Sequence, residues 1–452
     1  MAFSRLLIAN RGEIALRIQR AARELGLTTI QVHSSADADS LPVKLADVSV
    51  NIGPPQAAKS YLNIEAILNA ARATGAEAIH PGYGFLSENS AFADAVEAAG
   101  LVFVGPTGAT IRTMGDKAAA RAAAEAAGVP VVPGSEGRVD TVSAARAVAG
   151  EIGYPIMIKA SAGGGGRGIR VVENAGGLEA AFDQASAEAR AAFGDGGLYL
   201  EKLIARARHV EVQVLGDGEN AIHLYERECS LQRRRQKVWE EAPSVALSPA
   251  AREALCASAV ELARSVGYRG ACTLEYLYDD ATGKFYFIEM NTRIQVEHPI
   301  TEMVTSVDLV REMLRIAAGA PLAYKQADIR LNGHAIEARI NAEDPALKFR
   351  PAPGKVANYR APGGPGVRFD TLLYTGYQIS PFYDSLVGKL VVWDENRASA
   401  LQRMKRALGE LVVEGVATTA SLHKALVDDG EVRRGAYHTR WLEDWLETHA
   451  AS

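Results

Sequence analysis

The sequence predicts a mixed protein in which an α/β segment with a parallel sheet precedes α+β segments that are richer in strands. Over the first hundred residues, short apolar strand-like runs alternate with helical runs, which is typical of parallel βα units. From His209 onward strand-like runs predominate, with helices predicted over 249–266 and 307–319. The length of 452 residues suggests two to four domains of about 100–200 residues each.

The N-terminal alternation begins with an apolar strand at 5–9 and a turn at 10–12. Apolar side chains then recur at the helical period from Ile14 to Leu25, and Gly26 stands where a C-terminal cap belongs. The runs that follow predict strands at 28–33, 77–80 and 102–104 and a helix at 64–74.

An Ala-rich helix over 117–128 ends at Gly128 and Pro130, and a compact α+β segment follows as far as residue 201. That segment contains strands at 155–159 and 169–172 on either side of a glycine run. Farther along the chain, a Gly/Pro cluster marks a surface turn at 361–366, and helices are predicted at 398–412 and 418–428.

Composition favours a cytoplasmic enzyme or binding protein. The net charge of −5 gives no reason to expect nucleic acid or an anionic membrane as a partner. The three cysteines, Cys229, Cys256 and Cys272, form no C-x-x-C pair, which argues against structural zinc and disulfides and fits a reducing compartment. We find no signal-peptide pattern at the start and no apolar run near the ~20 residues of a membrane helix.

The glycine run at 161–168 formally matches the dinucleotide-binding pattern G-x-G-x-x-G. That pattern requires a helix after the glycines, whereas 169–172 is strand-like. A Walker A loop is excluded as well, because Lys159 precedes the glycines and no Gly-Lys-Ser/Thr follows. We interpret the run as a hairpin flap whose backbone N–H groups approach phosphate oxygens, with Lys159 adding positive charge. A flexible surface hairpin without a ligand is the alternative.

Two carboxylates are predicted to face each other on a hairpin formed by strands 271–279 and 284–291. A hairpin centred near residue 282 places Glu275 opposite Glu289. Like charges in these positions repel, and a cation between them reverses the effect. Magnesium favours one or two carboxylates together with phosphate oxygens, and Asn291 can add an oxygen on the same face.

The neighbours of this acidic pair are mainly apolar, which predicts that its face is at least half buried. They are Thr273, Leu277, Phe285 and Phe287. Two solvent-facing glutamates are the alternative.

Polar residues alternate with Ile294 and Val296 beyond the hairpin. If this segment is extended, Arg293, Gln295 and Glu297 stand side by side and offer a guanidinium, an amide and a carboxylate. Such a trio suits a small planar oxyanion and a base that deprotonates it, although a solvated edge strand looks similar.

A dense basic run occupies 232–237 and contains Gln232 and Lys237. A solvated basic loop is the simple interpretation of such a run. In an enzyme that uses ATP, the same run would surround anionic substrates. The nearby Cys229 has no evident base partner and is interpreted as a core residue.

Together, these segments resemble the biotin carboxylase family within the ATP-grasp fold, which includes the biotin carboxylase subunit of acetyl-CoA carboxylase. The resemblance covers essentially the whole chain. The segments that carry it are IANRGEIA (8–15), HPGYGFLSEN (80–89), MGDK (114–117), SAGGGGRG (161–168), RECS (227–230), FIEMNTRIQVEH (287–298) and RINAEDP (339–345).

The resemblance implies four parts. A Rossmann-like (pre-ATP-grasp) N-terminal domain spans 1–114, and a linker helix with the lid that carries the glycine flap spans 115–203. The ATP-grasp body spans 204–330, and the C-terminal biotin carboxylase domain spans 331–447.

It also implies a nucleotide site between lid and body, with magnesium or manganese held by Glu275, Glu289 and Asn291. The cofactor-binding residues that the resemblance implies, most of them on the nucleotide side of the cleft, are Tyr83, Lys117, Lys159, Gly164, Gly165, Gly166, Glu201, Lys202, Leu203, His209, Gln232, Leu277, Gln295 and Val296.

The activity implied by the resemblance is the carboxylation of biotin with ATP and bicarbonate. Bicarbonate would lie among Lys237, Arg293, Gln295 and Glu297, with Glu297 as general base. Carboxyphosphate would form and break to CO2 and phosphate, which would take the proton from the biotin ureido nitrogen. Arg339 would stabilise the resulting oxyanion.

The chain departs from the family pattern at two positions. Arg235 stands where the family usually has His, and Ala162 stands where it has Gly. Arginine is permanently charged, so contacts to nucleotide or phosphate are expected to differ there. The expected role is the first half-reaction of acetyl-CoA carboxylase or a related acyl-CoA carboxylase, and the departures add weight to the second of these.

The expected partners follow from what the sequence lacks, namely an Ala-Met-Lys-Met biotinylation motif and a carboxyltransferase segment. Biotin is expected on a biotin carboxyl carrier protein, and carboxyltransferase subunits are expected to use the product. The family resemblance also favours a homodimer. Two alternatives are another ATP-grasp ligase, which would keep the lysines and metal pair, and a non-catalytic nucleotide-binding module.

Overall fold

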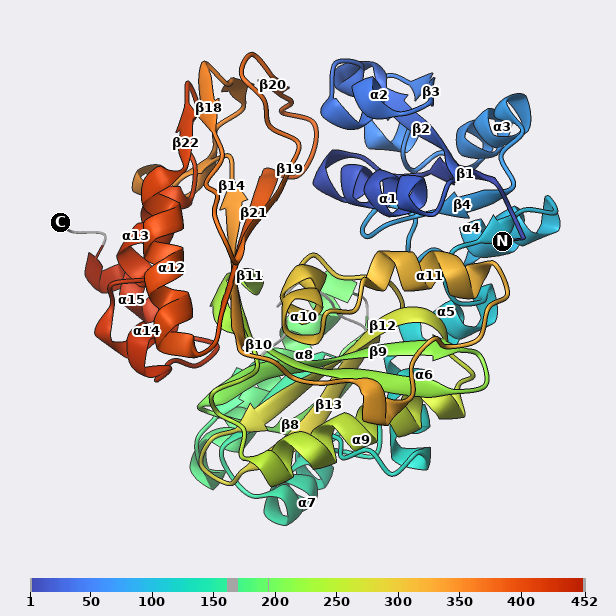
Figure 1. Cartoon of the computed structure of the whole chain (residues 1–452). Helices are drawn as coiled ribbons and strands as arrows, with labels where there is room; N and C mark the ends of the chain where they lie inside the picture. The colour runs from blue at the N-terminus through green and yellow to red at the C-terminus, as the bar shows by residue number, and fades with distance from the viewer. Residues whose placement is uncertain (1, 161–169, 194, 450–452) are drawn as a thin grey trace.

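The structure is a computed structural model that describes residues 2–160, 170–193 and 195–449. Figure 1 shows the N-terminal part in blue and the C-terminal helices in red on opposite sides of a group of strands that belongs to the largest sheet. The yellow-green body below them contains the rest of that sheet. The mixed α/β and α+β prediction is therefore confirmed.

The N-terminal part forms a parallel sheet, as the alternating pattern predicts. Its elements are β1 (Arg5–Ile8), α1 (Gly12–Glu24), β2 (Thr28–Ser34), α2 (Leu41–Leu45), β3 (Val48–Gly53), α3 (Ile64–Thr74), β4 (Ala78–His80), α4 (Ser90–Ala98), β5 (Val102–Phe103) and α5 (Gly108–Gly115). The strand order is β3-β2-β1-β4-β5, and every pair is parallel. Asn63 caps α3 by accepting the N–H of Ala66, and Gly75 ends it with φ +64°.

A small antiparallel unit with its own core follows helix α6 (Lys117–Ala126). Its elements are α7 (Val142–Ile152), β6 (Ile156–Ala160), β7 (Arg170–Val172), α8 (Leu178–Phe193) and β8 (Leu198–Lys202). The strand order is β7-β6-β8, and both helices pack on one core with the strands. The glycine run, including Gly164, Gly165 and Gly166, lies outside the described residues.

One eight-stranded sheet links the body to the C-terminal part. Its strands are β9 (Ala207–Asp217), β10 (Ala221–Arg233), β11 (Gln236–Ala242), β12 (Arg269–Asp279), β13 (Lys284–Asn291), β14 (His334–Asn341), β19 (Val367–Thr371) and β21 (Leu386–Asp394). The order is β13-β12-β9-β10-β11-β14-β21-β19, and every pair is antiparallel. Helices α9 (Pro249–Ser265), α10 (His298–Thr305) and α11 (Leu309–Ala317) pack against it.

A register shift in the β12–β13 hairpin decides which way Glu289 points. Tyr276 pairs with Phe287, but the next residue, Glu275, pairs with Glu289, so Ile288 is an extra residue on β13. Such a bulge changes the alternation of the strand. Phe287 therefore packs in the core with Tyr276, and Glu289 shares the opposite face with Glu275.

The bulge also corrects one expectation about that face. Phe285 and Phe287 were predicted to lie beside the acidic pair. Both instead belong to the core on the other side of the hairpin, where they pack around Tyr276. Strict alternation fails here because one residue is inserted between them and Glu289.

The C-terminal helices cover the far face of β14 and β21 and enclose the largest hydrophobic core. Apolar faces hold them there, since Leu401, Met404 and Leu408 recur at helical spacing and are buried. The helices are α12 (Arg397–Glu410), α13 (Ala420–Leu426), α14 (Gly430–Arg434) and α15 (Trp441–His449). The short elements are η1 (Ser35–Asp37), η2 (Ala57–Lys59), η3 (Ala175–Gly177), η4 (Gln326–Asp328), η5 (Pro345–Leu347), β15 (Glu343–Asp344), β16 (Arg350–Pro351), β17 (Gly354–Lys355), β18 (Asn358–Arg360), β20 (Gln378–Ile379) and β22 (Val412–Glu414). Among the helices of the described residues, none has the length and apolar character needed to cross a membrane.

Candidate active site

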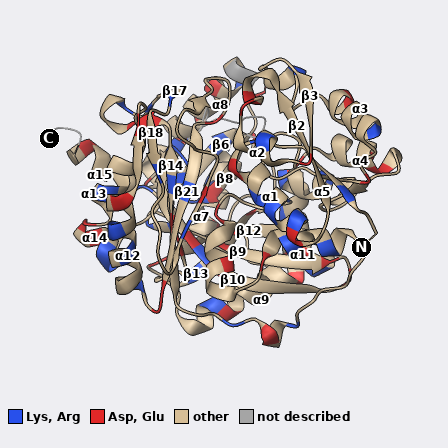
Figure 2. Cartoon of the chain, turned by 45° about the horizontal axis from the view of Figure 1, so that its top comes forward, with Lys and Arg blue, Asp and Glu red and all other residues tan. Residues whose placement is uncertain are grey.

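Four neighbouring strands bring charged side chains into one row of the eight-stranded sheet. Arg227 of β10 lies opposite Glu211 of β9. Glu211 lies opposite Glu275 of β12, which in turn lies opposite Glu289 of β13. Three carboxylates on adjacent strands repel one another, so the row requires neighbouring cations. Figure 2 shows that residues of both signs are interspersed along the central strands.

Lys237 is the cation that joins this row to the segment before α10. Its Nζ lies 2.5 Å from Glu211 Oε2, 2.9 Å from Glu275 Oε1 and 2.7 Å from Glu297 Oε1. Burial lowers the pKa of Lys237, but the surrounding carboxylates outweigh burial and hold the pKa well above its usual value. A permanently charged ammonium therefore sits among three buried acids.

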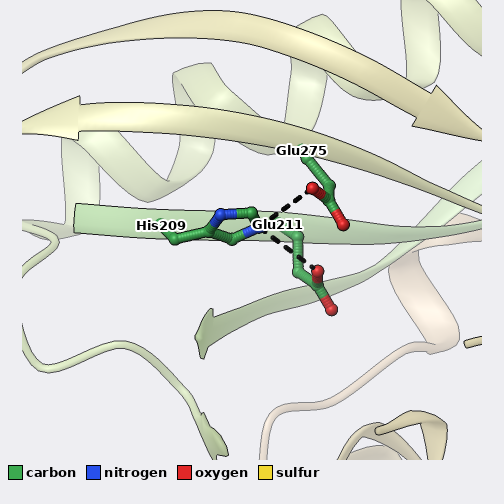
Figure 3. A group of neighbouring side chains, drawn as sticks. All are labelled: His209, Glu211 and Glu275. Atoms are coloured by element: carbon green, nitrogen blue, oxygen red, sulfur yellow. Dashed lines mark ion pairs between the residues drawn. The ribbon is translucent and has the colours of Figure 1, made fainter. Parts of the chain in front are cut away.

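His209 adds a second positive charge to the same acids. Its Nε2 lies 3.1 Å from Glu275 Oε2 and 3.8 Å from Glu211 Oε2 (Figure 3). Burial lowers the pKa of His209, but the charge of Glu275 outweighs burial and raises the pKa to about 9. Burial likewise raises the pKa of Glu275, and Lys237 and His209 bring it well below the usual value. Glu275 is therefore an anion throughout the neutral range.

Glu289 is the acid that this network leaves without a partner. It is partly buried and makes no hydrogen bond or ion pair with the residues that the structure describes. Burial and then the charge of Glu275 raise its pKa. Asn291 lies close by and donates from Nδ2 to Glu275 Oε1 at 3.1 Å. Two facing carboxylates and an amide oxygen form a donor set that fits a hard divalent cation.

The segment from Arg293 to Glu297 is not an extended strand, which corrects the sequence expectation. It bends away after β13 and turns into α10, with Glu297 in the N-cap position at φ −81°. The side chains still meet at the acidic row. Gln295 Nε2 donates to Glu275 Oε1 at 2.9 Å, and Arg293 donates to Asn291 Oδ1 at 3.1 Å.

Glu297 lies between two cations. Besides Lys237, Arg339 of β14 donates from Nη2 to Glu297 Oε2 at 3.0 Å. Burial and Glu211 raise the pKa of Glu297. Lys237 and Arg339 lower it by a larger amount, so the pKa ends below its usual value. Glu297 is thus ionised at neutral pH, as a general base must be.

The other predicted binding residues fall into two groups. The first group belongs to the small unit and its linker. Lys159 pairs with Glu201, Lys202 Nζ donates to Tyr154 O at 2.7 Å, and Leu203 N donates to Pro155 O at 3.1 Å. Lys117 is close enough to Glu289 to lower the pKa of that carboxyl group. The second group lies on the body: Leu277 pairs in register with His209, Gln232 donates to Cys229 O at 2.9 Å, and Val296 O accepts from Lys389.

Tyr83 stands apart from the predicted nucleotide residues. Its hydroxyl donates to Glu13 Oε1, and Glu13 Oε2 lies 3.1 Å from Lys389 Nζ. Tyr83 therefore belongs with Glu13 and Lys389, between the N-terminal part and β21.

Sequence reasoning assigned no role to Arg227, Glu211 and Glu88. Arg227 is fully buried and donates to Glu211, Gln213, Thr273, Thr301 and Gln295. Glu88 accepts from Arg293 Nε at 2.8 Å. The polar alternation His209, Glu211, Gln213 within an otherwise apolar strand is a signal that could have identified the first of these acids.

Three family models together cover almost the whole chain. The model of the biotin carboxylase N-terminal domain matches residues 2–111, that of the carbamoyl-phosphate synthase L chain ATP-binding domain matches 116–325, and that of the biotin carboxylase C-terminal domain matches 337–444. A biotin carboxylase from Pseudomonas aeruginosa is 55% identical over 444 residues, which are 98% of each chain. This chain belongs to the biotin carboxylase family.

The relatives of this biotin carboxylase family member serve more than one carboxylase. A pyruvate carboxylase subunit from Methanothermobacter thermautotrophicus is 50% identical over 98% of this chain and 90% of its own. A Campylobacter jejuni biotin carboxylase in an ATP-analogue complex superposes with a TM-score of 0.90 at 47% identity, over 98% and 99% of the two chains. The Hydrogenobacter thermophilus 2-oxoglutarate carboxylase domain, solved as a dimer with MgADP and bicarbonate, gives 0.88 at 48% identity over 100% and 99%.

These matches confirm the family, the ATP-grasp-type fold and the enzyme class, an ATP-dependent ligase. They also confirm the expected activity at the level of the family, which is the carboxylation of biotin with ATP and bicarbonate.

Proposed function

We propose that this chain carboxylates biotin on a separate biotin carboxyl carrier protein, as the first half-reaction of acetyl-CoA carboxylase or a related acyl-CoA carboxylase. A relative named only as a biotin carboxylase is 55% identical, and a relative named as a subunit of pyruvate carboxylase is 50% identical, so identity does not single out one final acceptor. The final acceptor is therefore assigned to the carboxyltransferase subunits that use the product.

The nucleotide would lie between the small unit and the eight-stranded sheet. Lys117 and Lys159 would contact its phosphates, and Gly164, Gly165 and Gly166 would approach them through backbone N–H groups. The remaining contacts, which include the adenine side, would come from Glu201, Lys202, Leu203, His209, Gln232, Leu277, Gln295 and Val296. The contact between Lys159 and Glu201 supports this arrangement, because it brings two of the predicted nucleotide-binding side chains together on the small unit.

Glu275, Glu289 and Asn291 would hold magnesium or manganese. Glu289 faces Glu275 and has no hydrogen-bond or ion-pair partner within residues 2–160, 170–193 and 195–449, which supports this assignment. When bound, the ion would neutralise charge on the phosphate oxygens during transfer.

Bicarbonate would lie near Lys237, Arg293, Gln295 and Glu297. Glu297 would accept its proton, which makes the bicarbonate oxygen a better nucleophile toward the terminal phosphorus. That oxygen forms a bond to phosphorus as the bond to ADP breaks, giving carboxyphosphate. The ionised state of Glu297 between Lys237 and Arg339 supports the role of base.

Arg339 would act on biotin. Carboxyphosphate breaks to CO2 and phosphate, and the phosphate takes the ureido proton of biotin, which leaves negative charge on the ureido oxygen. Arg339 would stabilise that charge through its guanidinium. Tyr83 contacts Glu13, which pairs with Lys389, the residue opposite Arg339 on the neighbouring strand. Tyr83 would therefore line the biotin end of the site.

The single observation that carries the proposal is the position of Lys237. One ammonium contacts Glu275 of the metal pair and Glu297, the base, at distances below 3 Å. Phosphate activation and bicarbonate deprotonation would therefore occur side by side.

We also propose the division into 1–114, 115–203, 204–330 and 331–447, a homodimer, and a cytoplasmic location. The small unit has a hydrophobic core of its own, which supports a domain boundary after residue 203. A solved dimer of a related biotin carboxylase domain supports the homodimer.

ADP release by the purified chain tests the proposal. We expect release that requires bicarbonate and rises when free biotin is added. Release that depends on another carboxylate would favour a different ATP-grasp ligase. Tight ATP binding without any turnover would favour a non-catalytic module.

A further inference from the structure

Four ionisable side chains surround the contact between Arg339 and Glu297, with Arg339 itself one of the four and partly buried. In register, Glu240 of β11 lies opposite Glu337 of β14, and Arg339 of β14 lies opposite Lys389 of β21. Each charge therefore has its own sign directly across the strand pair. Glu240, Glu337 and Lys389 have no exposed surface, and α10 packs on β14 and β21.

Neither cation of this group forms an ion pair with Glu337. Arg339 donates from Nε to Glu240 Oε1 at 2.6 Å and from Nη2 to Glu297 Oε2 at 3.0 Å. Lys389 Nζ donates to Val296 O at 2.8 Å and lies 3.1 Å from Glu13 Oε2.

Three carboxyl oxygens remain without a hydrogen-bond partner among the described residues. They are both oxygens of Glu337 and Oε2 of Glu240, and all three are buried. An ionised carboxylate that is buried and unpaired is strongly unfavourable, so such a group takes up a proton instead. One proton on Glu337 supplies an O–H donor, and Glu240 Oε2 is an acceptor on the facing residue.

The surrounding charges agree with this count. Burial raises the pKa of Glu337 well above its usual value, although Lys389 and Arg339 oppose the shift. Burial also raises the pKa of Glu240 to about 7, with Glu297 adding to the shift and Arg339 and Lys237 opposing it. At the start of α10, His298 contributes no charge, because burial holds its pKa well below the usual value.

We infer that Glu240 and Glu337 hold one proton between them, carried by Glu337 and donated to Glu240, and that the single negative charge left on Glu240 positions Arg339 toward Glu297. With two negative charges, Glu337 would compete with Glu297 for the guanidinium. With none, Arg339 would lose its anchor. Both glutamates are positioning residues, and their kinetic consequence rests on the proposed function.

Infrared spectroscopy of the whole wild-type chain tests the protonation directly. We expect the carbonyl band of a protonated carboxylic acid at pH 8, shifted in D2O, that disappears in Glu337→Gln and persists in the exposed control Glu219→Gln. A wild-type spectrum with only ionised carboxylates at this pH overturns the inference, whether or not any variant folds.

Steady-state kinetics test the positioning. Glu337→Gln keeps a neutral group of the same shape and is expected to retain kcat within about two-fold. Glu240→Gln removes a charged hydrogen-bond acceptor and is expected to lower kcat about 10- to 100-fold. An equal loss in the two variants overturns the inference.

The pH profile separates positioning from a general loss of structure. Because the pKa of Glu240 is raised to about 7, its anchoring charge is present above that pH and is lost as pH falls through it. We expect an acid limb of kcat near pH 7 in the wild type and in Glu337→Gln, and no such limb in Glu240→Gln. If the wild type shows no biotin-dependent ADP release at all, the proposed function fails, whereas the infrared result stands by itself.

Discussion

Replacing Glu289 with Gln should make the chain more stable and much less active. Glu289 faces Glu275 across the β12–β13 hairpin, is partly buried, and makes no ion pair or hydrogen bond with the described residues, although Lys117 partly offsets its charge. Its pKa is raised by burial and by Glu275, so the ionised form is unfavourable in the folded state at neutral pH. Glutamine keeps the shape and removes the charge.

The size of each effect follows from the site. Two unit charges about 5 Å apart repel by about 3 kcal/mol at an effective dielectric constant of 20, and partial exposure reduces this to about 1 kcal/mol of stability gained without ligand. If Glu289 is one of two carboxylate ligands to the metal, as proposed, its loss should lower kcat about 1,000-fold, the upper range for removal of one group that stabilises transition-state charge.

Two measurements on the same preparations separate these effects. Chemical denaturation gives the free energy of unfolding, and ADP release over a magnesium titration gives kcat and the concentration of metal required. The exposed Glu219→Gln is the matched control and should change neither. Near-normal turnover in Glu289→Gln would refute the metal role, and a loss of stability would refute the repulsion.

Two further changes probe residues that lie deeper. Arg227→Met leaves Glu211 with fewer cations in a fully buried site, and should lower the free energy of unfolding by about 3–5 kcal/mol and slow turnover, measured by denaturation and ADP release. His423 is neutral because burial lowers its pKa to about 4, so its contribution to stability is present above about pH 6.5 and is lost as pH falls. From pH 7 to pH 5, His423→Gln should therefore lose about 2 kcal/mol less of its free energy of unfolding than the wild type does. If denaturation at the two pH values shows that both proteins lose the same amount, this assignment is contradicted.

The hairpin with the acidic pair shows what could be predicted from the sequence. Glu275 and Glu289 face each other as predicted, but the turn is not centred near residue 282. Asp279 pairs with Lys284, which alone would place Ile288 opposite Glu275, and the extra residue Ile288 restores the predicted pair. The neighbours were not predicted correctly, because Phe285 and Phe287 lie between the turn and the bulge and pair with Tyr278 and Tyr276 on the other face, whereas Glu289 lies beyond the bulge. Nothing in the apolar and polar alternation marks an inserted residue, since a bulge depends on how two strands pair.

The sequence did not predict the path of the 293–297 segment or the ion pairs between residues that are far apart in the chain. The alternation from Arg293 to Glu297 matched a strand, but a turn into α10 brings Gln295 and Glu297 to the same acids. The partners of Glu297 are Lys237 of β11 and Arg339 of β14, so the electrostatics of the base depend on strands that are far apart in the chain.

The central claim is that the two acids at 275 and 289 and the base at 297 act on one reaction, in which a bicarbonate oxygen attacks the terminal phosphorus of ATP. Turnover with 18O-labelled bicarbonate and biotin tests this most directly. We expect one labelled oxygen in the released phosphate, because the oxygen that bonds to phosphorus stays there when the C–O bond breaks. Phosphate whose new oxygen comes entirely from water would contradict it.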